Sequence, residues 1–157
     1  VPGRHINSQN TLLKLLNMGI IPIINENDTI STDEIEFGDN DTLSAYVATL
    51  VQADLLILLS DIDGLYSADP KKQTNAEIIR SVEKITPELE KLASGTSASF
   101  STGGMITKIA AAKICAEARI DTIITNGNDP AIIFDILEGK DIGTHFVANN
   151  NELILKD

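Results

Sequence analysis

The chain has 157 residues, which is enough for one globular domain with a substantial core and short for two. Apolar residues make up 43% of it but aromatics only 4%, and Trp is absent, so the core must be aliphatic, as in layered α/β proteins. The formal net charge of −11 argues against an electrostatic surface for nucleic acid or for an anionic membrane.

The first predicted elements are a helix and a buried strand. Leucines recur along one side of residues 7–18, which predicts a helix that ends at Gly19. Residues 20–24 form a short continuous apolar run, typical of a buried parallel strand. Because Pro22 cannot donate a backbone hydrogen bond, we expect it among the first residues of this strand or at an edge of the sheet.

A polar and acidic stretch, residues 25–41, follows this strand. We expect a hairpin in its middle, over residues 29–37. Residues 42–51 then show a helical pattern, and either Asn40 or Asp41 is the natural N-cap.

The next strand is predicted over residues 54–59, which are apolar after the first position. Residues 66–85 have the composition of an irregular excursion. Thr86 and Pro87 then mark a helix start, because Thr is a good N-cap and Pro is favoured at the first helical position. Residues 94–104 are rich in Ser, Thr and Gly, which predicts a loop.

The last part of the chain continues the alternation. A helix is predicted over residues 104–119, a strand over 120–125, a helix over 130–138 and a short strand over 153–155. Strands that alternate with helices favour a parallel sheet with helices on both faces, a three-layer αβα sandwich. We find no linker that would divide residues 1–157 into two domains.

Neither a membrane span nor a targeting segment is indicated, so we expect a cytoplasmic protein. The longest apolar run is residues 55–59, far too short to cross a bilayer. Cys115 is the only cysteine, so an intrachain disulfide and a thiolate metal cluster are excluded, and we expect it to be a small buried residue of a helix.

Three polar clusters follow predicted strands or begin a predicted helix. They are residues 25–28, residues 38–41 and residues 60–64. Each cluster alone has a plain structural explanation, because Asn and Asp are ordinary turn and cap residues. Together they indicate a ligand site, because open parallel sheets bind ligands at the carboxyl ends of their strands.

A fourth motif is the Ser- and Gly-rich segment 99–108, which runs into a helix and includes Lys108. Backbone N–H groups at a helix N-terminus favour a phosphate. A cation there costs roughly 0.3–1 kcal/mol at an exposed site, so an anionic ligand would explain Lys108 better than helix stability does. The spacing is not that of a P-loop, and a surface loop followed by a solvated Lys is the alternative.

Taken together, these motifs resemble the glutamate 5-kinases, a proline-biosynthesis branch of the amino acid kinase family. The similarity runs in order from about residue 4 to about residue 146. It rests on four segments: residues 22–28 (PIINEND), 38–45 (GDNDTLSA), 60–70 (SDIDGLYSADP) and 102–108 (TGGMITK).

The resemblance implies roles for the acidic cluster residues. Asp28 would bind the ammonium group of glutamate and Asn40 its carboxylates. Asn25 and Asp41 would belong to the same polar network. Asp41 would also orient lysines around the transferred phosphoryl group, which makes Asp41 and Lys108 the expected catalytic residues.

The resemblance also implies a nucleotide site. Ser60 and Asp61 match a pair that contacts the nucleotide, and the ATP loop would comprise Thr102, Gly103, Gly104, Met105, Ile106, Thr107 and Lys108. No residue is implied as a protein ligand of a metal, although Mg²⁺ would accompany ATP.

The implied reaction is ATP-dependent phosphorylation of the side-chain carboxylate of L-glutamate, which gives L-glutamyl 5-phosphate in the first step of proline biosynthesis. The implied partners are small molecules, with proline as a feedback inhibitor, and the subunits would form a homo-oligomer. Nucleic acid and membrane are not expected partners.

Two departures from the family pattern stand out. The family begins with a strand and a glycine-rich phosphate loop with its own Lys, but this chain starts at what resembles the family's midpoint. We therefore expect residues 1–157 to be the nucleotide-binding second half of an amino acid kinase domain. The RNA-modification-type (PUA) domain that many relatives carry is not evident.

Three alternatives remain at this point. Another relative, such as an N-acetylglutamate kinase or an aspartokinase, would share the motifs in part. A nucleotide-sensing module without catalysis would keep the ATP loop but would not need Asp28, Asn40 and Asp41. A purely structural assembly domain would not bind ATP at all.

Overall fold

The computed structural model describes residues 2–25, 39–70, 72–95 and 104–148. Its centre is a four-stranded sheet of β1 (Leu55–Ser60), β2 (Ser81–Val82), β3 (Asp121–Asn126) and β4 (Thr144–Phe146), in the order β1-β3-β4-β2. β1 is parallel to β3 and β2 is parallel to β4, whereas β3 and β4 are antiparallel. The predicted mostly parallel α/β sheet is therefore confirmed.

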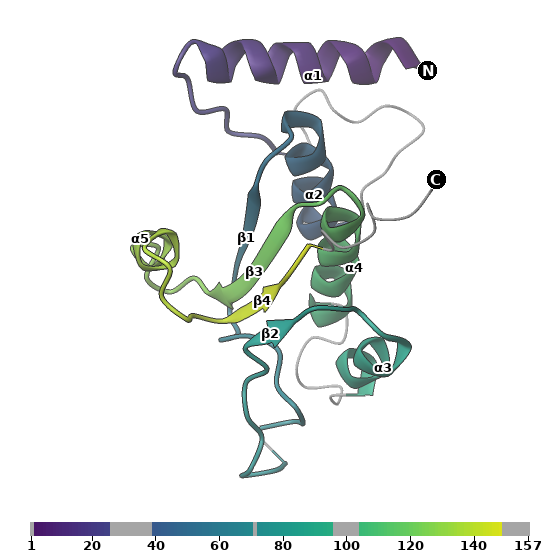
Figure 1. Cartoon of the computed structure of the whole chain (residues 1–157), viewed down its shortest axis with the longest axis vertical. Coiled ribbons are helices and arrows are strands. Elements are labelled where there is room, and N and C mark those ends of the chain that lie inside the picture. The colour runs from purple at the N-terminus through teal and green to yellow at the C-terminus, as the bar shows by residue number, and fades with distance from the viewer. Residues whose placement is uncertain (1, 26–38, 71, 96–103, 149–157) are drawn as a thin grey trace, which may run out of the picture.

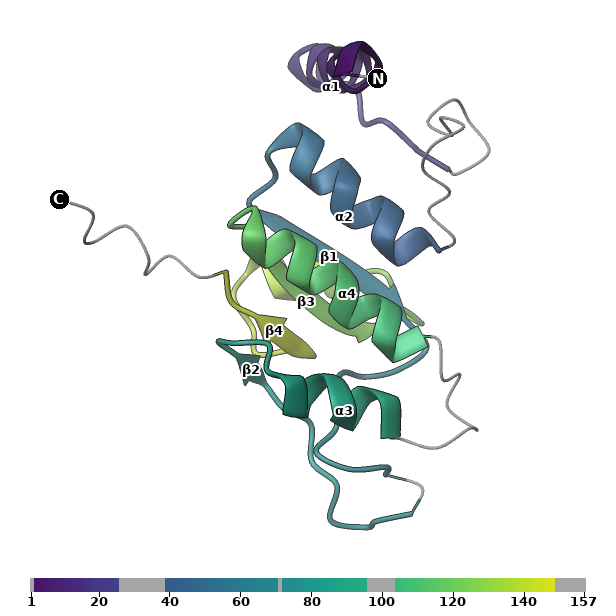
Figure 2. The ribbon, with the colours of Figure 1, turned by 90° about the vertical axis from the view of Figure 1, so that its right-hand side faces the viewer.

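Helices lie on both faces of this sheet. They are α1 (Pro2–Asn17), α2 (Asn40–Val51), α3 (Pro87–Gly95), α4 (Gly104–Glu117) and α5 (Ile132–Leu137). Figure 1 shows α2 and α4 on one side of the sheet and the short α5 on the other. In Figure 2, α2, α4 and α3 cover the face toward the viewer, and α1 lies beyond α2. This is the predicted three-layer arrangement.

Small residues bring α2 and α4 close together over the sheet. Ala45 of α2 and both Ala111 and Cys115 of α4 are fully buried, and Ala112 of α4 is 1% exposed. Side chains of this size allow two helix backbones to approach closely. The close packing places the first turn of α2 beside the N-terminal part of α4, so that Asp41 lies next to Lys108, the fifth residue of α4.

Cys115 is buried as the sequence analysis expected, and burial raises the pKa of its thiol. The thiol is therefore neutral near pH 7 and poorly nucleophilic. Cys115 is a packing residue of the core.

The helix starts are only partly as predicted. Thr86 caps α3, because its hydroxyl accepts a hydrogen bond from the backbone N–H of Leu89 (3.3 Å), and Pro87 is the first helical residue. The predicted N-cap of α2, Asn40 or Asp41, is wrong. Asp39 is the cap, because its backbone is extended and its carboxylate accepts from the N–H of Thr42 (2.7 Å). This leaves the carboxylate of Asp41 available for other contacts.

The predicted buried strand at residues 20–24 is also wrong. The structure has no strand there, and Ile21 and Ile23 are 86% and 95% exposed. An apolar run becomes a strand only where a neighbouring strand supplies backbone partners, and among the described residues β1 is hydrogen-bonded to β3 alone. Pro22 and Ile24 instead lie against α2 and Leu56 of β1.

The other predicted elements are largely found. The bounds of α1, α4 and α5 differ by a few residues from the prediction, and α1 begins five residues earlier. Residues 66–85 are mainly irregular, although β2 and an isolated bridge between Tyr66 and Ile78 lie within them. The predicted hairpin over 29–37 and the strand over 153–155 lie outside the described residues. In the part of the chain that is described, no helix has the length and apolar character needed to cross a membrane.

Candidate active site

A cavity of about 90 Å³ opens at the carboxyl end of β1. It lies between this strand end, the first turn of α4 and the loop that follows β1. Its lining residues are Ser60, Asp61, Ile62, Gly64, Leu65, Tyr66, Ala68, Pro70, Ala93, Gly104, Met105 and Lys108. The strand end is where the sequence analysis expected a ligand.

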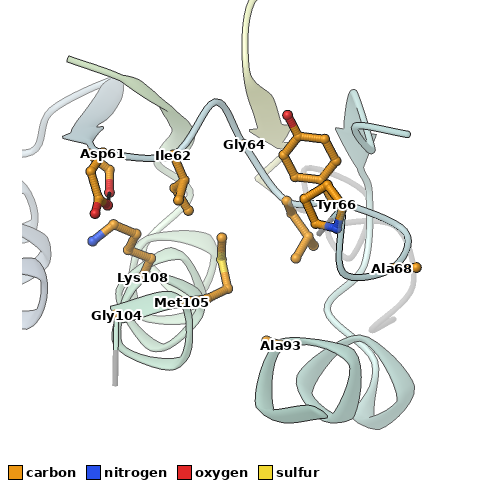
Figure 3. Close-up of a pocket in the computed structure, with 12 residues that line it drawn as sticks. Asp61, Ile62, Gly64, Tyr66, Ala68, Ala93, Gly104, Met105 and Lys108 are labelled. Carbon is orange, nitrogen blue, oxygen red and sulfur yellow. Dashed lines mark hydrogen bonds between the residues drawn. The ribbon is translucent and has the colours of Figure 1, made fainter. Parts of the chain in front are cut away.

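The cavity has a charged end and an apolar end. In Figure 3, Lys108 extends from α4 toward Asp61, Ile62 and Met105 lie next along the cavity, and Tyr66 and Ala68 lie farther away. Asp61 is exposed. A ligand that fits must therefore combine a flat or apolar part with an anionic part.

The ammonium group of Lys108 is held by Asp41. Its Nζ lies 3.0 Å from Oδ2 and 3.3 Å from Oδ1 of Asp41, and the two side chains are only 12% and 20% exposed. Asp41 lies in the first turn of α2, where a carboxylate is favoured by the helix dipole. The ion pair therefore offsets the unfavourable position of Lys108 at the start of α4 and at the same time orients its charge.

A buried hydroxyl holds the loop that lines the cavity. Thr144 of β4 is fully buried, and its Oγ1 accepts a hydrogen bond from the backbone N–H of Leu65 (2.8 Å). Gly64, at φ +156°, permits this contact, because a Cβ there would lie 2.7 Å from the same hydroxyl oxygen. A larger residue at position 64 would displace the loop.

Asp63 links the loop to the end of β3 and to Tyr66. Asn126 donates from Nδ2 to Oδ1 of Asp63 (2.9 Å), and the hydroxyl of Tyr66 donates to Oδ2 (3.3 Å). Burial raises the pKa of Tyr66, and the charge of Asp63 and its hydrogen bond raise it further. The phenol of Tyr66 is therefore neutral over the physiological range.

We expect the substitution Asp63→Asn to lower the pKa of Tyr66 toward its ordinary value, because the negative charge of Asp63 is removed while burial and a hydrogen-bond acceptor at position 63 remain. The difference between the absorbance titrations at 295 nm of the protein and of its Tyr66→Phe variant would isolate Tyr66. An unchanged Tyr66 titration would contradict the contact with Asp63.

The structure gathers five of the predicted nucleotide residues on one cavity: Ser60, Asp61, Gly104, Met105 and Lys108. Asp41 joins them through its ion pair with Lys108. Two further predicted residues of this group, Thr102 and Gly103, lie outside the described residues, as does Asp28. Ile106 does not line the cavity and is 44% exposed. The hydroxyl of Thr107 faces Asp41.

The predicted substrate residues Asn25 and Asn40 lie on a different groove. It has a volume of about 490 Å³, and its other lining residues are Pro22, Ile24, Leu43, Ser44, Val47, Ala48 and Leu56. Asn40 is adjacent in sequence to Asp41, so the first turn of α2 connects this groove to the Lys108 ion pair. The structure therefore separates the substrate candidates from the nucleotide candidates.

Several lining residues were not predicted as site residues. Tyr66 and Pro70 belong to a motif that the sequence analysis quoted, but no role was assigned to them. Ala93 lines the cavity from α3, whereas Thr144 of β4 holds the cavity loop without lining the cavity itself. Nothing in the local sequence of either residue signals a site. Only the tertiary packing brings them to the loop.

The described residues do not contain a group of three or more His, Cys, Asp or Glu side chains that could hold a metal ion. Mg²⁺ commonly binds through phosphates, waters and one or two carboxylates.

Comparison with known proteins gives consistent results. The model of the amino acid kinase family matches residues 2–126. Glutamate 5-kinase of Listeria monocytogenes serovar 1/2a is 53% identical over 93% of this chain and 54% of its own length. Glutamate 5-kinase of Clostridium perfringens is 54% identical over 91% of this chain and 55% of its own length.

Solved structures agree at the level of the fold. UMP kinase from Bacillus anthracis has a TM-score of 0.60 at 16% identity, and the match covers 90% of this chain and 51% of that structure. The chain spans about half the length of the curated relatives it matches. With a family match over most of the chain and the expected αβα layers around a strand-end cavity, the chain belongs to the amino acid kinase family.

Proposed function

We propose that the protein transfers the γ-phosphoryl group of ATP to the side-chain carboxylate of L-glutamate, and that the product, L-glutamyl 5-phosphate, enters proline biosynthesis. The observation that carries this proposal is the Asp41–Lys108 ion pair beside the strand-end cavity. The acceptor is suggested by the two relatives named glutamate 5-kinase.

The chemistry needs positive charge more than it needs a base. A carboxylate is already ionised at neutral pH, so no proton has to be removed from the nucleophile. The barrier arises from repulsion between this anion and the polyphosphate. Lys108 would reduce the barrier by donating hydrogen bonds to the phosphoryl oxygens in the transition state, and the carboxylate of Asp41 would hold the ammonium in place.

The cavity supports a nucleotide with its phosphates at the charged end. Ile62, Leu65 and Met105 offer an apolar wall for a base, whereas Lys108 and Gly104, from the start of α4, line the other end (Figure 3). The N-terminus of a helix favours a phosphate. Mg²⁺ would supply further charge neutralisation. The residues present fit that ion, since the exposed carboxylate of Asp61 and the phosphates could share it.

We place glutamate near the groove that Asn25 and Asn40 line. Two side-chain amides there can donate to carboxylates. The first turn of α2 connects this groove to Asp41, so an acceptor bound there would lie near the phosphoryl group that Lys108 contacts. Asp28 remains our candidate for the ammonium group, on the strength of the sequence motif.

The acceptor is tested by trapping the acyl phosphate. Full-length protein with Mg-ATP and hydroxylamine should form hydroxamate with L-glutamate at a rate at least about tenfold above that with N-acetylglutamate or aspartate. N-acetylglutamate lacks the ammonium charge and aspartate is one methylene shorter, and each difference contributes more than about 1.4 kcal/mol. Faster reaction with either competitor would assign the protein to another branch of the family. ATP binding without hydroxamate from any of the three would favour a nucleotide-sensing module.

Two finer points belong to the same proposal. Adding proline at millimolar concentration to the hydroxamate assay would test whether proline competes with glutamate. Light scattering of the full-length protein would measure its mass in solution and so test whether it forms a homo-oligomer. Either result would leave the assignment of the acceptor unchanged.

A further inference from the structure

The hydroxyl of Thr107 faces two acceptors. Its Oγ1 lies 2.8 Å from Oδ2 of Asp41 and 2.9 Å from the backbone oxygen of Gly104. A hydroxyl carries a single hydrogen, so it can donate to only one of them at a time. Which acceptor receives the hydrogen determines what Thr107 does.

The carboxylate is the stronger acceptor of the two. Hydrogen bonds to an ionised oxygen are stronger than those to a neutral carbonyl. The bond from Thr107 to Asp41 also joins two helices, since these two residues are 66 positions apart in sequence. The bond to Gly104 is the ordinary contact that a helical Thr makes with a carbonyl of the preceding turn. Thr107 therefore donates to Asp41.

Asp41 is then held from two sides. Its Oδ2 accepts from Thr107 and from the ammonium of Lys108 at 3.0 Å, whereas its Oδ1 is 3.3 Å from the same ammonium. Without the hydroxyl, only the Lys108 ammonium would hold the carboxylate, so the two groups could turn together about χ2 of Asp41. The direction of the Lys108 charge thus depends on Thr107.

We infer that Thr107 is a positioning residue for phosphoryl transfer: its hydroxyl holds Asp41, and Asp41 aims Lys108. This inference rests on the proposed function. The resemblance to glutamate 5-kinases had implied that Thr107 contacts the nucleotide, but its side chain does not line the cavity. Thr107 would instead act on the phosphoryl group indirectly, through Asp41, and only its hydroxyl would be needed for this role.

The central variants are Thr107→Val, which keeps the shape and removes the hydroxyl, and Thr107→Ser, which keeps the hydroxyl. In the full-length protein we expect Thr107→Val to lower kcat about tenfold with the KM of ATP and of the acceptor changed less than about twofold. Thr107→Ser should restore kcat to within about threefold of the wild type.

Thr49→Val is the matched control, because the hydroxyl of Thr49 makes the same kind of helical bond, to the backbone oxygen of Ala45 (2.7 Å), and does not contact Asp41. This variant should leave kcat unchanged. An equal loss of kcat in Thr49→Val would show that the effect comes from the helices as a whole.

A double-mutant cycle tests the route through Asp41. In an Asp41→Ala background, Thr107→Val should lower kcat by less than about twofold further, because its partner is already gone. A full tenfold further loss would overturn the inference, since Thr107 would then act on its own.

A measurement that does not need turnover separates this inference from the proposed function. In protein labelled with ¹⁵N at lysine Nζ, the Lys108 ammonium should give a signal that is absent in Lys108→Met. That signal should shift or broaden in Thr107→Val and persist in Thr107→Ser and Thr49→Val. A signal that is identical in wild type and Thr107→Val would refute the inference even if glutamate proved not to be the acceptor.

Discussion

Lys108→Met should lower kcat by roughly two to four orders of magnitude, with a much smaller change in the KM of ATP. The reason is the position of its ammonium at the charged end of the cavity, held by Asp41 at 3.0 Å and only 12% exposed. A charge fixed in advance stabilises the phosphoryl oxygens most where negative charge grows, which is in the transition state. Methionine keeps most of the length of the side chain and removes the charge together with its three N–H donors.

Steady-state kinetics of the full-length protein would measure this effect. Lys113→Met is the matched control, because Lys113 lies on the same helix, is 56% exposed and pairs with Glu90 at the surface. Lys113→Met should leave kcat and KM within about twofold of the wild-type values, because an exposed ion pair contributes little to stability. If both variants lost activity equally, or if Lys108→Met raised only the KM of ATP, Lys108 would not have the role proposed here.

Asp41→Ala should have the second largest effect, a loss of kcat on the order of a hundredfold together with lower stability. Its removal leaves the Lys108 ammonium without its partner in a site where both side chains are mostly buried. An unpaired charge in such a place costs about 2–3 kcal/mol of unfolding free energy. Urea unfolding and steady-state kinetics would measure the two effects on the same protein.

Asp135→Ala is the control for this prediction. Asp135 pairs with Lys140 on the surface, where the two side chains are 45% and 55% exposed. We expect a change in unfolding free energy below about 1 kcal/mol and no change in kcat. A stable and fully active Asp41→Ala variant would contradict the account of the ion pair.

The sequence predicts long elements of this fold well and short ones poorly. The helical pattern of residues 104–119 and the apolar run of residues 54–59 are long enough to be unambiguous, and both correspond to real elements, α4 and β1. β2 and β4 have two and three residues, too few to show an alternating pattern. They form because β3 offers β4 an antiparallel neighbour and β4 in turn offers β2 a parallel one.

Residues 20–24 show the opposite error. Their apolar composition resembles that of β1, but composition reports a tendency to be buried and does not specify a partner. β1 pairs with β3, whereas the described part of the chain supplies no strand that pairs with Ile21 and Ile23. The N-cap of α2 was misplaced by one or two residues for a related reason, because Asp39, Asn40 and Asp41 are all good caps and only backbone geometry chooses among them.

The residues of the site also divide into those that the sequence predicts and those that it does not. Residues within continuous motifs, such as Asp61, Gly104 and Lys108, could be predicted because strand ends and helix starts place them locally. Thr144 and Ala93 could not, since they reach the cavity loop through tertiary packing alone. The contact between Asp41 and Lys108 joins two helices, and only the resemblance to a family indicated that these residues lie near each other.

The most direct test of this account is a crystal structure of the full-length protein with Mg²⁺ and a non-hydrolysable ATP analogue. We predict that the phosphates lie at the start of α4, with Nζ of Lys108 within about 3.2 Å of a phosphoryl oxygen and still paired with Asp41. The base should lie along the apolar wall that includes Ile62 and Met105. A nucleotide bound elsewhere, or phosphates that do not contact Lys108, would contradict the central claim that this cavity is the phosphoryl-transfer site.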